Sequence, residues 1–238
     1  MYLTYYLLGI ILIPGIIFAI YAQSKVTSSF NKYKGVNYSQ TKPVHEKVRF
    51  FLDAMGMYDI KVVKTKGFLT DHYNPKTETI ALSDEVYNST SIASLGIACH
   101  EIGHALQKKQ GYGLMKLRTF LIPFINIGSF LMWPLVIIGL LLEFSQYFYT
   151  GRILLIVGVA IFGLSVLFSA ITLPIEKDAS KRAYKMLVET GELTQEEGEG
   201  VKAVLDSAAL TYVASLIISI LSFIRFALSI FLSLRRHD

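Results

Sequence analysis

Apolar and polar positions alternate along the chain in long blocks. Four runs of about 20 residues or more contain almost no charged side chain, and polar segments separate them. The runs cover residues 2–22, 119–142, 147–173 and 208–234. At about 1.5 Å per residue, an α-helix over any one of these runs crosses about 30 Å of hydrocarbon. The pattern predicts a mainly α-helical integral membrane protein with about four transmembrane helices.

The flanks of these runs refine that prediction. No Lys or Arg precedes the first run and Phe18–Ala22 is a poor cleavage site, so we interpret it as a retained anchor rather than a signal peptide. Only a few residues separate the second and third runs, which predicts a transmembrane hairpin over 119–173. Arg225 lies inside the fourth run, where a charge is costly. The path of that run across the bilayer therefore stays open.

Basic residues orient the polar segments. Of the 23 Lys and Arg residues, 14 lie in 23–118 and 5 in 174–207. Basic residues are enriched on the cytoplasmic side of membrane proteins. We therefore expect a multi-pass membrane protein with both segments in the cytoplasm. The predicted order is an anchor at 1–22, a cytoplasmic region at 23–118, the hairpin at 119–173, a cytoplasmic segment at 174–207, and a last helix with its tail at 208–238.

The first polar segment has the pattern of a small α+β region. Apolar spacing predicts a helix over 43–55, and the β-branched residues of 60–65 predict a strand. Residues 69–73 and 79–82 flank the turn signal Asn74–Thr77, which predicts a hairpin. A further helix is expected over 91–110, with Ser89, Thr90 or Ser91 as its cap and Gly111 at its end.

That last helix carries the sequence His100-Glu101-Ile102-Gly103-His104. Residues four apart on a helix share one face, so both imidazoles can bind one zinc ion. Glu101 lies beside them, where it can take a proton from a water molecule and deliver it to a leaving amine. The pattern predicts a metallopeptidase site with one zinc per chain.

A catalytic zinc needs a third protein ligand. The extended motif with Gly and His at positions 107 and 110 is absent, because both positions are Gln. A carboxylate from another segment is therefore expected. Glu176, just after the predicted hairpin, is the main candidate, and Asp178 is the rival or a support for a histidine.

Other polar residues are candidates for stabilising the transition state. A donor directed at the developing oxyanion is required, and the candidates are His72, Tyr73, Arg182 and Tyr184, with His72 and Arg182 first. The predicted hairpin ending near Leu82 also offers a strand edge for an extended peptide.

Composition narrows the function class. Hydrophobic residues make up 53% of the 238 residues, and the net charge is +5. The basic residues flank apolar runs instead of forming a face interleaved with aromatics, so we expect the lipid bilayer as a partner and no nucleic acid. The single cysteine, Cys99, excludes an intrachain disulfide and is interpreted as an apolar helix residue.

The motif, the membrane hairpin and the segment Leu173-Pro174-Ile175-Glu176-Lys177-Asp178 together resemble the neutral zinc metallopeptidase family of bacterial membranes, often called YugP-like. Residues 71–75 and 208–214 are also similar to that family. The general plan is similar to HtpX proteases and CAAX prenyl endopeptidases. The resemblance implies His100, His104 and Glu176 as zinc ligands and Glu101 as the catalytic base. Those relatives often have Asp four residues after the ligand Glu, so Ser180 is not expected to support the site.

The resulting hypothesis is a membrane-embedded zinc metalloendopeptidase of the gluzincin type. It hydrolyses peptide bonds of a peptide or protein substrate, which includes membrane proteins in quality control or processing. Two alternatives stay open. The protein is a site-2-type intramembrane protease, or it is a non-catalytic zinc-binding membrane scaffold.

Overall fold

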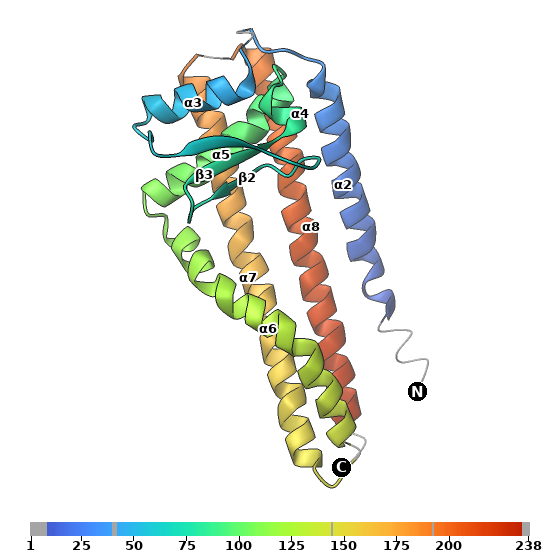
Figure 1. The fold of residues 1–238 in the computed structure, drawn as a ribbon. Coiled ribbons are helices and arrows are strands. Elements are labelled where there is room, and N and C mark those ends of the chain that lie inside the picture. Colours follow the sequence, from blue (N-terminus) through green and yellow to red (C-terminus); the bar gives the residue numbers. More distant parts are fainter. Residues whose placement is uncertain (1–8, 40–41, 144, 192, 235–238) are drawn as a thin grey trace. The chain divides into compact units, whose positions relative to one another are not determined.

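The computed structural model describes residues 9–39, 42–143, 145–191 and 193–234 (Figure 1). The fold is mainly helical, as predicted, and its described part contains one small sheet. Contacts divide the chain into two compact units. The polar unit comprises Ala22–Lys116 and Pro174–Thr211, and the apolar unit comprises the remaining segments.

Three helices in the described residues are long and apolar enough to cross a membrane. They are α6 (Gly113–Glu143), α7 (Phe148–Glu189) and α8, whose apolar part is found within Gln195–Leu232. By length and composition, these three helices are candidate membrane spans and coincide with three of the four predicted runs. The first predicted span begins in residues outside those described, and its described part belongs to α2 (Ile13–Lys34). The number four therefore stays a prediction.

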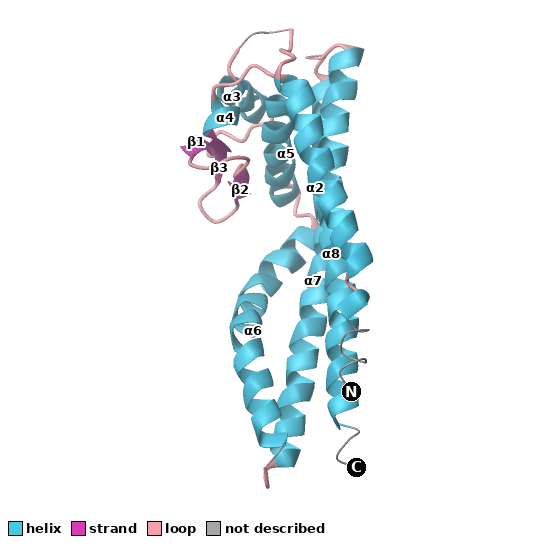
Figure 2. Cartoon of the chain, turned by 90° about the vertical axis from the view of Figure 1, so that its right-hand side faces the viewer, coloured by secondary structure: helices cyan, strands magenta, loops and turns pink. Residues whose placement is uncertain are grey.

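Helices α6 and α7 form the predicted hairpin in the apolar unit. Pro123 and Pro134 lie inside α6, which Figure 2 shows as a curved helix. Near the turn, Glu143 pairs with Arg152, with 3.2 Å between Oε1 and Nε. The pair neutralises a carboxylate that is buried at the end of α6.

The segment 174–207 is mostly helical. Helix α7 continues through Pro174 to Glu189, and only residues 190–194 separate it from α8 (Gln195–Leu234). Thr194 and Glu197 form a reciprocal cap at the start of α8, where the Thr194 amide donates to Glu197 and the Glu197 amide donates to Thr194. The segment is thus made of the polar extensions of two apolar helices, because no strong breaker follows Pro174 until Gly191.

The sheet of the polar unit has the order β1-β3-β2. Strand β1 (Lys61–Thr65) runs parallel to β3 (Thr79–Ser83), and β2 (His72–Asn74) pairs antiparallel with β3. The predicted β-hairpin of residues 69–82 is confirmed. Its first strand is shorter than expected, since Leu69 adopts a positive φ of 52° before the strand begins. Strand β2 is an edge strand, and Figures 1 and 2 show it beside α5.

Helix α5 (Ile92–Lys109) is the central helix of the polar unit. It packs against α3 (Val44–Ala54), α4 (Asp84–Tyr87) and the sheet, and its apolar face is buried in the largest core cluster. Both predicted ends are confirmed. The Ser91 side chain accepts from the Ser94 amide, and Gly111 adopts a φ of +66° while the next amide bonds back to Gln107 O at 2.9 Å.

Candidate metal centre

Three ligand atoms converge between α5 and α7 within the polar unit. His100 Nε2 and His104 Nε2 each lie 3.2 Å from Glu176 Oε2. Two ligands at 2.0–2.1 Å from a tetrahedral zinc ion are themselves about 3.3 Å apart. The spacing of these atoms therefore fits a metal ion held by two imidazoles and one carboxylate, and in the described residues no other such group is found.

A close helix crossing brings Glu176 to the two histidines. A Cβ atom added at Gly103 would lie 2.4 Å from the carbonyl oxygen of Ala179. The backbones of α5 and α7 therefore touch between the ligands, and only glycine permits that distance. Ala179 and Ala183 keep the facing side of α7 small and are buried.

The second nitrogen of His104 is held by a buried amide. Gln107 Nε2 lies 2.8 Å from both Ile175 O and Asp178 Oδ2, which can only accept hydrogen bonds. The amide oxygen of Gln107 must therefore face His104 Nδ1, at 2.9 Å, and that nitrogen must carry the proton. It follows that Nε2 of His104 presents its lone pair to the site, as a metal ligand requires.

His100 has a comparable support. Its Nδ1 atom lies 3.1 Å from the hydroxyl oxygen of Ser180, one turn after Glu176 on α7. The expectation that Ser180 plays no supporting part is therefore wrong. A serine is shorter than the aspartate of the relatives, but the close crossing at Gly103 brings it within reach.

The charges of the site stabilise one another. Burial alone would raise the pKa of Glu176, but hydrogen bonds and positive charge from His100 and His104 outweigh burial and hold that pKa well below its usual value. For His104, burial favours the neutral ring, yet the bond to Glu176, the charges of Glu101 and Glu176, and the bond to Gln107 together raise the pKa. The buried carboxylate is thus balanced by the imidazoles, and a bound cation would take the place of the positive charge on the histidine.

Glu101 differs from the other acidic residues of the site. Its side chain is buried, with 7% of the residue exposed, and it lies close enough to His104 to affect its pKa. Among the described residues, none forms a hydrogen bond or an ion pair with this carboxylate. It is therefore free to bind water beside the ligands.

Asp178 and Arg182 lie at the border of the site. Asp178 does not join the three ligand atoms, and its carboxylate accepts from Gln107 and from Arg182 Nε at 2.5 Å. Arg182 also donates to Gln110 and lies over the ring of Tyr112, 5.7 Å from its centroid. The guanidinium thus fastens α7 to the end of α5.

The other candidate residues lie apart from the three ligands. His72 is exposed on β2, and its Nδ1 atom lies 2.9 Å from Thr70 O. Tyr73 is next to it, and Lys108 lies nearby, although burial still raises the pKa of this tyrosine. Tyr184 packs in the core near Gly198 of α8. In the described part of the chain, no hydrogen bond or ion pair joins these residues to the three ligands.

Two supporting residues were absent from the sequence-based prediction. Gln107 and Ser180 were noted only as departures from known motifs. Their spacing could have indicated them. Gln107 is three residues after His104 and Ser180 is four residues after Glu176, so each lies on the same helix face as a ligand.

Two histidines four residues apart on one helix, a glutamate from a second helix and an unpaired glutamate beside them define the class of zinc-peptidase-like sites. The chain belongs to the family described as "Putative neutral zinc metallopeptidase", whose model matches residues 8–231. It is also similar to "Putative membrane protease YugP" of Bacillus subtilis (strain 168), with 40% identity over 219 residues, which cover 92% of this chain and 93% of that protein. No solved structure matches the chain.

Proposed function

We propose that the protein is a membrane-embedded zinc metalloendopeptidase of the gluzincin type. His100, His104 and Glu176 would hold one zinc ion per chain. The observation that carries the proposal is the convergence of their three ligand atoms beside the unpaired carboxylate of Glu101. The family of the chain and the name of its Bacillus relative support the same activity.

The roles of the residues follow from their positions. When bound, zinc supplies a Lewis acid that polarises the scissile carbonyl and lowers the pKa of water. Glu101 accepts the proton of the attacking water and then delivers it to the leaving amine. Gln107 and Ser180 hold the two imidazoles with their Nε2 atoms directed at the metal position.

The substrate would be an extended peptide. Strand β2 is at the edge of the sheet and packs near α5, so its outer backbone groups are available for an added strand. His72 lies on this strand and would be close to a peptide bound there. Arg182 is held by Asp178 and Gln110, so we assign it a structural role rather than oxyanion binding.

We further propose that the site faces the cytoplasm and acts on membrane proteins in quality control or processing. The ligands belong to the polar unit, which holds most of the basic residues. Helix α5 is not among the described helices that are apolar enough to span a membrane. These facts favour a juxtamembrane site over the site-2-type alternative.

The test compares detergent-purified wild type with Glu101→Gln, Glu176→Gln and the exposed control Glu199→Gln. Zinc content and casein cleavage are measured on the same samples. Glu101→Gln should keep its zinc and lose activity at least about 100-fold, because the general base is removed. Glu176→Gln should lose both, while Glu199→Gln should resemble wild type.

Two results would contradict the proposal. Cleavage that persists in Glu101→Gln would remove the assigned base. Full zinc retention in Glu176→Gln would remove the third ligand. Zinc bound to wild type without cleavage of any substrate would favour the non-catalytic scaffold instead.

A further inference from the structure

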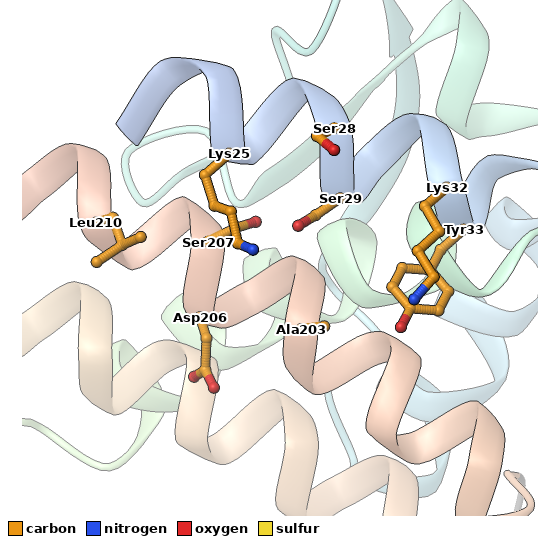
Figure 3. A pocket seen from close by; sticks show the side chains of 9 residues that line it. All are labelled: Lys25, Ser28, Ser29, Lys32, Tyr33, Ala203, Asp206, Ser207 and Leu210. Carbon is orange, nitrogen blue, oxygen red and sulfur yellow. The ribbon is translucent and has the colours of Figure 1, made fainter. Parts of the chain in front are cut away.

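A pocket of about 340 Å³ lies between α2 and α8 in the polar unit (Figure 3). None of the residues that line it belongs to the candidate metal centre. The polar lining of α2 comprises Lys25, Ser28, Ser29, Lys32 and Tyr33, and α8 contributes Ser207 among others. The proposed peptidase function leaves this pocket without a role.

The pocket lies at the ends of two apolar runs. Helix α2 changes from apolar to polar residues after Ala22, and α8 changes from polar to apolar residues after Ser207. Leu210, from the apolar side of that boundary, also lines the pocket. Such a boundary is where the headgroups of a bilayer lie. A ligand in the pocket would therefore be at headgroup depth, with an apolar side chain on its membrane side.

The charge of the pocket is positive. Lys25 and Lys32 are seven residues apart on α2, so they lie on one face of the helix. Neither forms an ion pair with any residue that the structure describes. The acidic lining residue, Asp206, is paired with Lys202 at 2.6 Å and points away from α2 in Figure 3. The Lys32 ammonium lies over the ring of Tyr33, 4.8 Å from its centroid, and the positive charge of both lysines is left to attract an anion.

Hydroxyl groups provide directional donors beside this charge. Ser29 is buried, with 8% of the residue exposed, and neither it nor Ser28 forms a hydrogen bond in the described part of the chain. The Ser29 hydroxyl is therefore free to donate to a ligand in the pocket. In Figure 3 the Lys25 ammonium and the Ser29 hydroxyl point into the same space, and the Ser207 hydroxyl beside them donates its proton to Val204 O at 2.7 Å. Ammonium and hydroxyl donors around one space suit the oxygens of a phosphate group.

We infer that this pocket binds the phosphate headgroup of an anionic phospholipid. Free phosphate could accept from the same donors. The pocket lies at the end of both apolar runs, however, and Leu210 gives it an apolar side, which favours the lipid. The bound lipid would join α2 to α8 in the polar unit. The inference does not depend on peptidase activity.

The test measures retention of phosphatidylglycerol by native mass spectrometry after titration into detergent-purified protein, with phosphatidylcholine as the neutral comparison. The variant Lys25→Gln/Lys32→Gln removes the charge of the pocket. The control Lys66→Gln/Lys76→Gln removes the same charge from exposed positions near the sheet. Each pocket lysine should contribute roughly fivefold to the apparent affinity, so the pocket variant should lose roughly 25-fold and the control little.

A second variant, Ser29→Leu, fills the pocket without changing its charge and should also weaken retention. The Tm of each variant reports whether it is folded. Equal retention of phosphatidylglycerol by wild type and the pocket variant would overturn the inference, as would equal retention of the two lipids by wild type. Displacement of phosphatidylglycerol by millimolar inorganic phosphate would overturn the lipid as the ligand and assign the pocket to free phosphate.

Discussion

Gln107 determines which nitrogen of His104 is free for a metal. Its amide nitrogen is fixed by the carbonyl of Ile175 and the carboxylate of Asp178, so its oxygen can only face His104 Nδ1. An amide is suited to this role because it donates at one end and accepts at the other. A carboxylate at this position would repel Asp178, and an apolar side chain would leave buried groups unpaired.

Replacing Gln107 with Met should weaken zinc binding about 10- to 100-fold, as is typical when a partner of a metal-ligating histidine is removed. Gln23→Met is the matched control, since that residue is exposed on α2 and its side chain forms no hydrogen bond in the described part of the chain. Competition with a zinc chelator on purified protein measures both affinities. Equal affinities in the two variants would show that Gln107 does not orient the ligand.

The site also predicts how stability depends on pH in zinc-free protein. The folded-state pKa of His104 is raised, so its pair with Glu176 contributes fully below the unfolded pKa of about 6.5 and is lost as pH rises through the folded value. The pKa of Glu176 is lowered, so its contribution is present above about 4.5 and is lost only in acid. The Tm of chelator-treated protein should therefore fall from pH 6 to pH 9.

Zinc-loaded protein should show the opposite trend over the same range, because protons compete with the metal for His104. Differential scanning fluorimetry of both forms in detergent checks this. Glu176→Gln removes the partner and should abolish most of the fall in the zinc-free form. A Tm that rises with pH in zinc-free wild type would contradict the assigned ion pair.

At the residue scale, the sequence predicted the local part of the site and not its supports. The two histidines and Glu101 lie on one helix, so their spacing alone places them together. Glu176 is 72 positions from His104 and was indicated by its position after the membrane hairpin and by family resemblance. Gln107 and Ser180 have side chains that are common at exposed positions, and their roles depend on a helix crossing that no local pattern encodes.

At the scale of the elements, the crossing of α5 and α7 depends on one glycine, Gly103. The backbone of α5 touches that of α7 at Gly103, and the ligands are on both sides of the contact. Replacing Gly103 with Ala would place a methyl group 2.4 Å from Ala179 O, and a backbone atom cannot move as a flexible side chain can. The helices would have to separate, which would move Glu176 away from both histidines.

We expect Gly103→Ala to cost about 1–3 kcal/mol of stability and most of the bound zinc. Gly198→Ala in α8 is the control, because the nearest atom to its added Cβ is 3.9 Å away and alanine favours a helix by about 1 kcal/mol. Zinc content and Tm are measured for both. Gly103→Ala with full zinc and an unchanged Tm would show that the crossing tolerates a side chain.

Element prediction succeeded where the period of apolar residues was clear. Helix α5, strand β1 and the β-hairpin of β2 and β3 appear within a few residues of their expected ends. The charges of segment 174–207 predicted a polar segment but not its secondary structure. A helix continues through a change in polarity when nothing breaks it, and Pro174 did not end α7.

At the scale of the whole molecule, the candidate metal ligands and the apolar helix segments belong to different compact units, although single helices run through both units. Helices α2, α7 and α8 each pass from one unit to the other, yet all three metal-ligand candidates and their supports belong to the polar unit. The polar unit contains the larger buried core, which includes residues of α3, α5, α7 and α8. Metal binding should therefore stabilise the polar unit more than the apolar unit.

Removing zinc should loosen the polar unit and leave the membrane hairpin unchanged. Binding stabilises only those states in which α5 and the start of the polar part of α7 are assembled, whereas the hairpin keeps its backbone hydrogen bonds because an apolar surrounding offers no alternative. Hydrogen exchange with mass spectrometry, with and without a chelator, measures this. Protection should fall over 92–109 and 174–189 and stay constant over 119–165. Glu176→Gln should show no chelator effect, because its zinc is already lost. An equal loss of protection in the hairpin would show that the two units unfold as one, and the metal would then stabilise the membrane part as well.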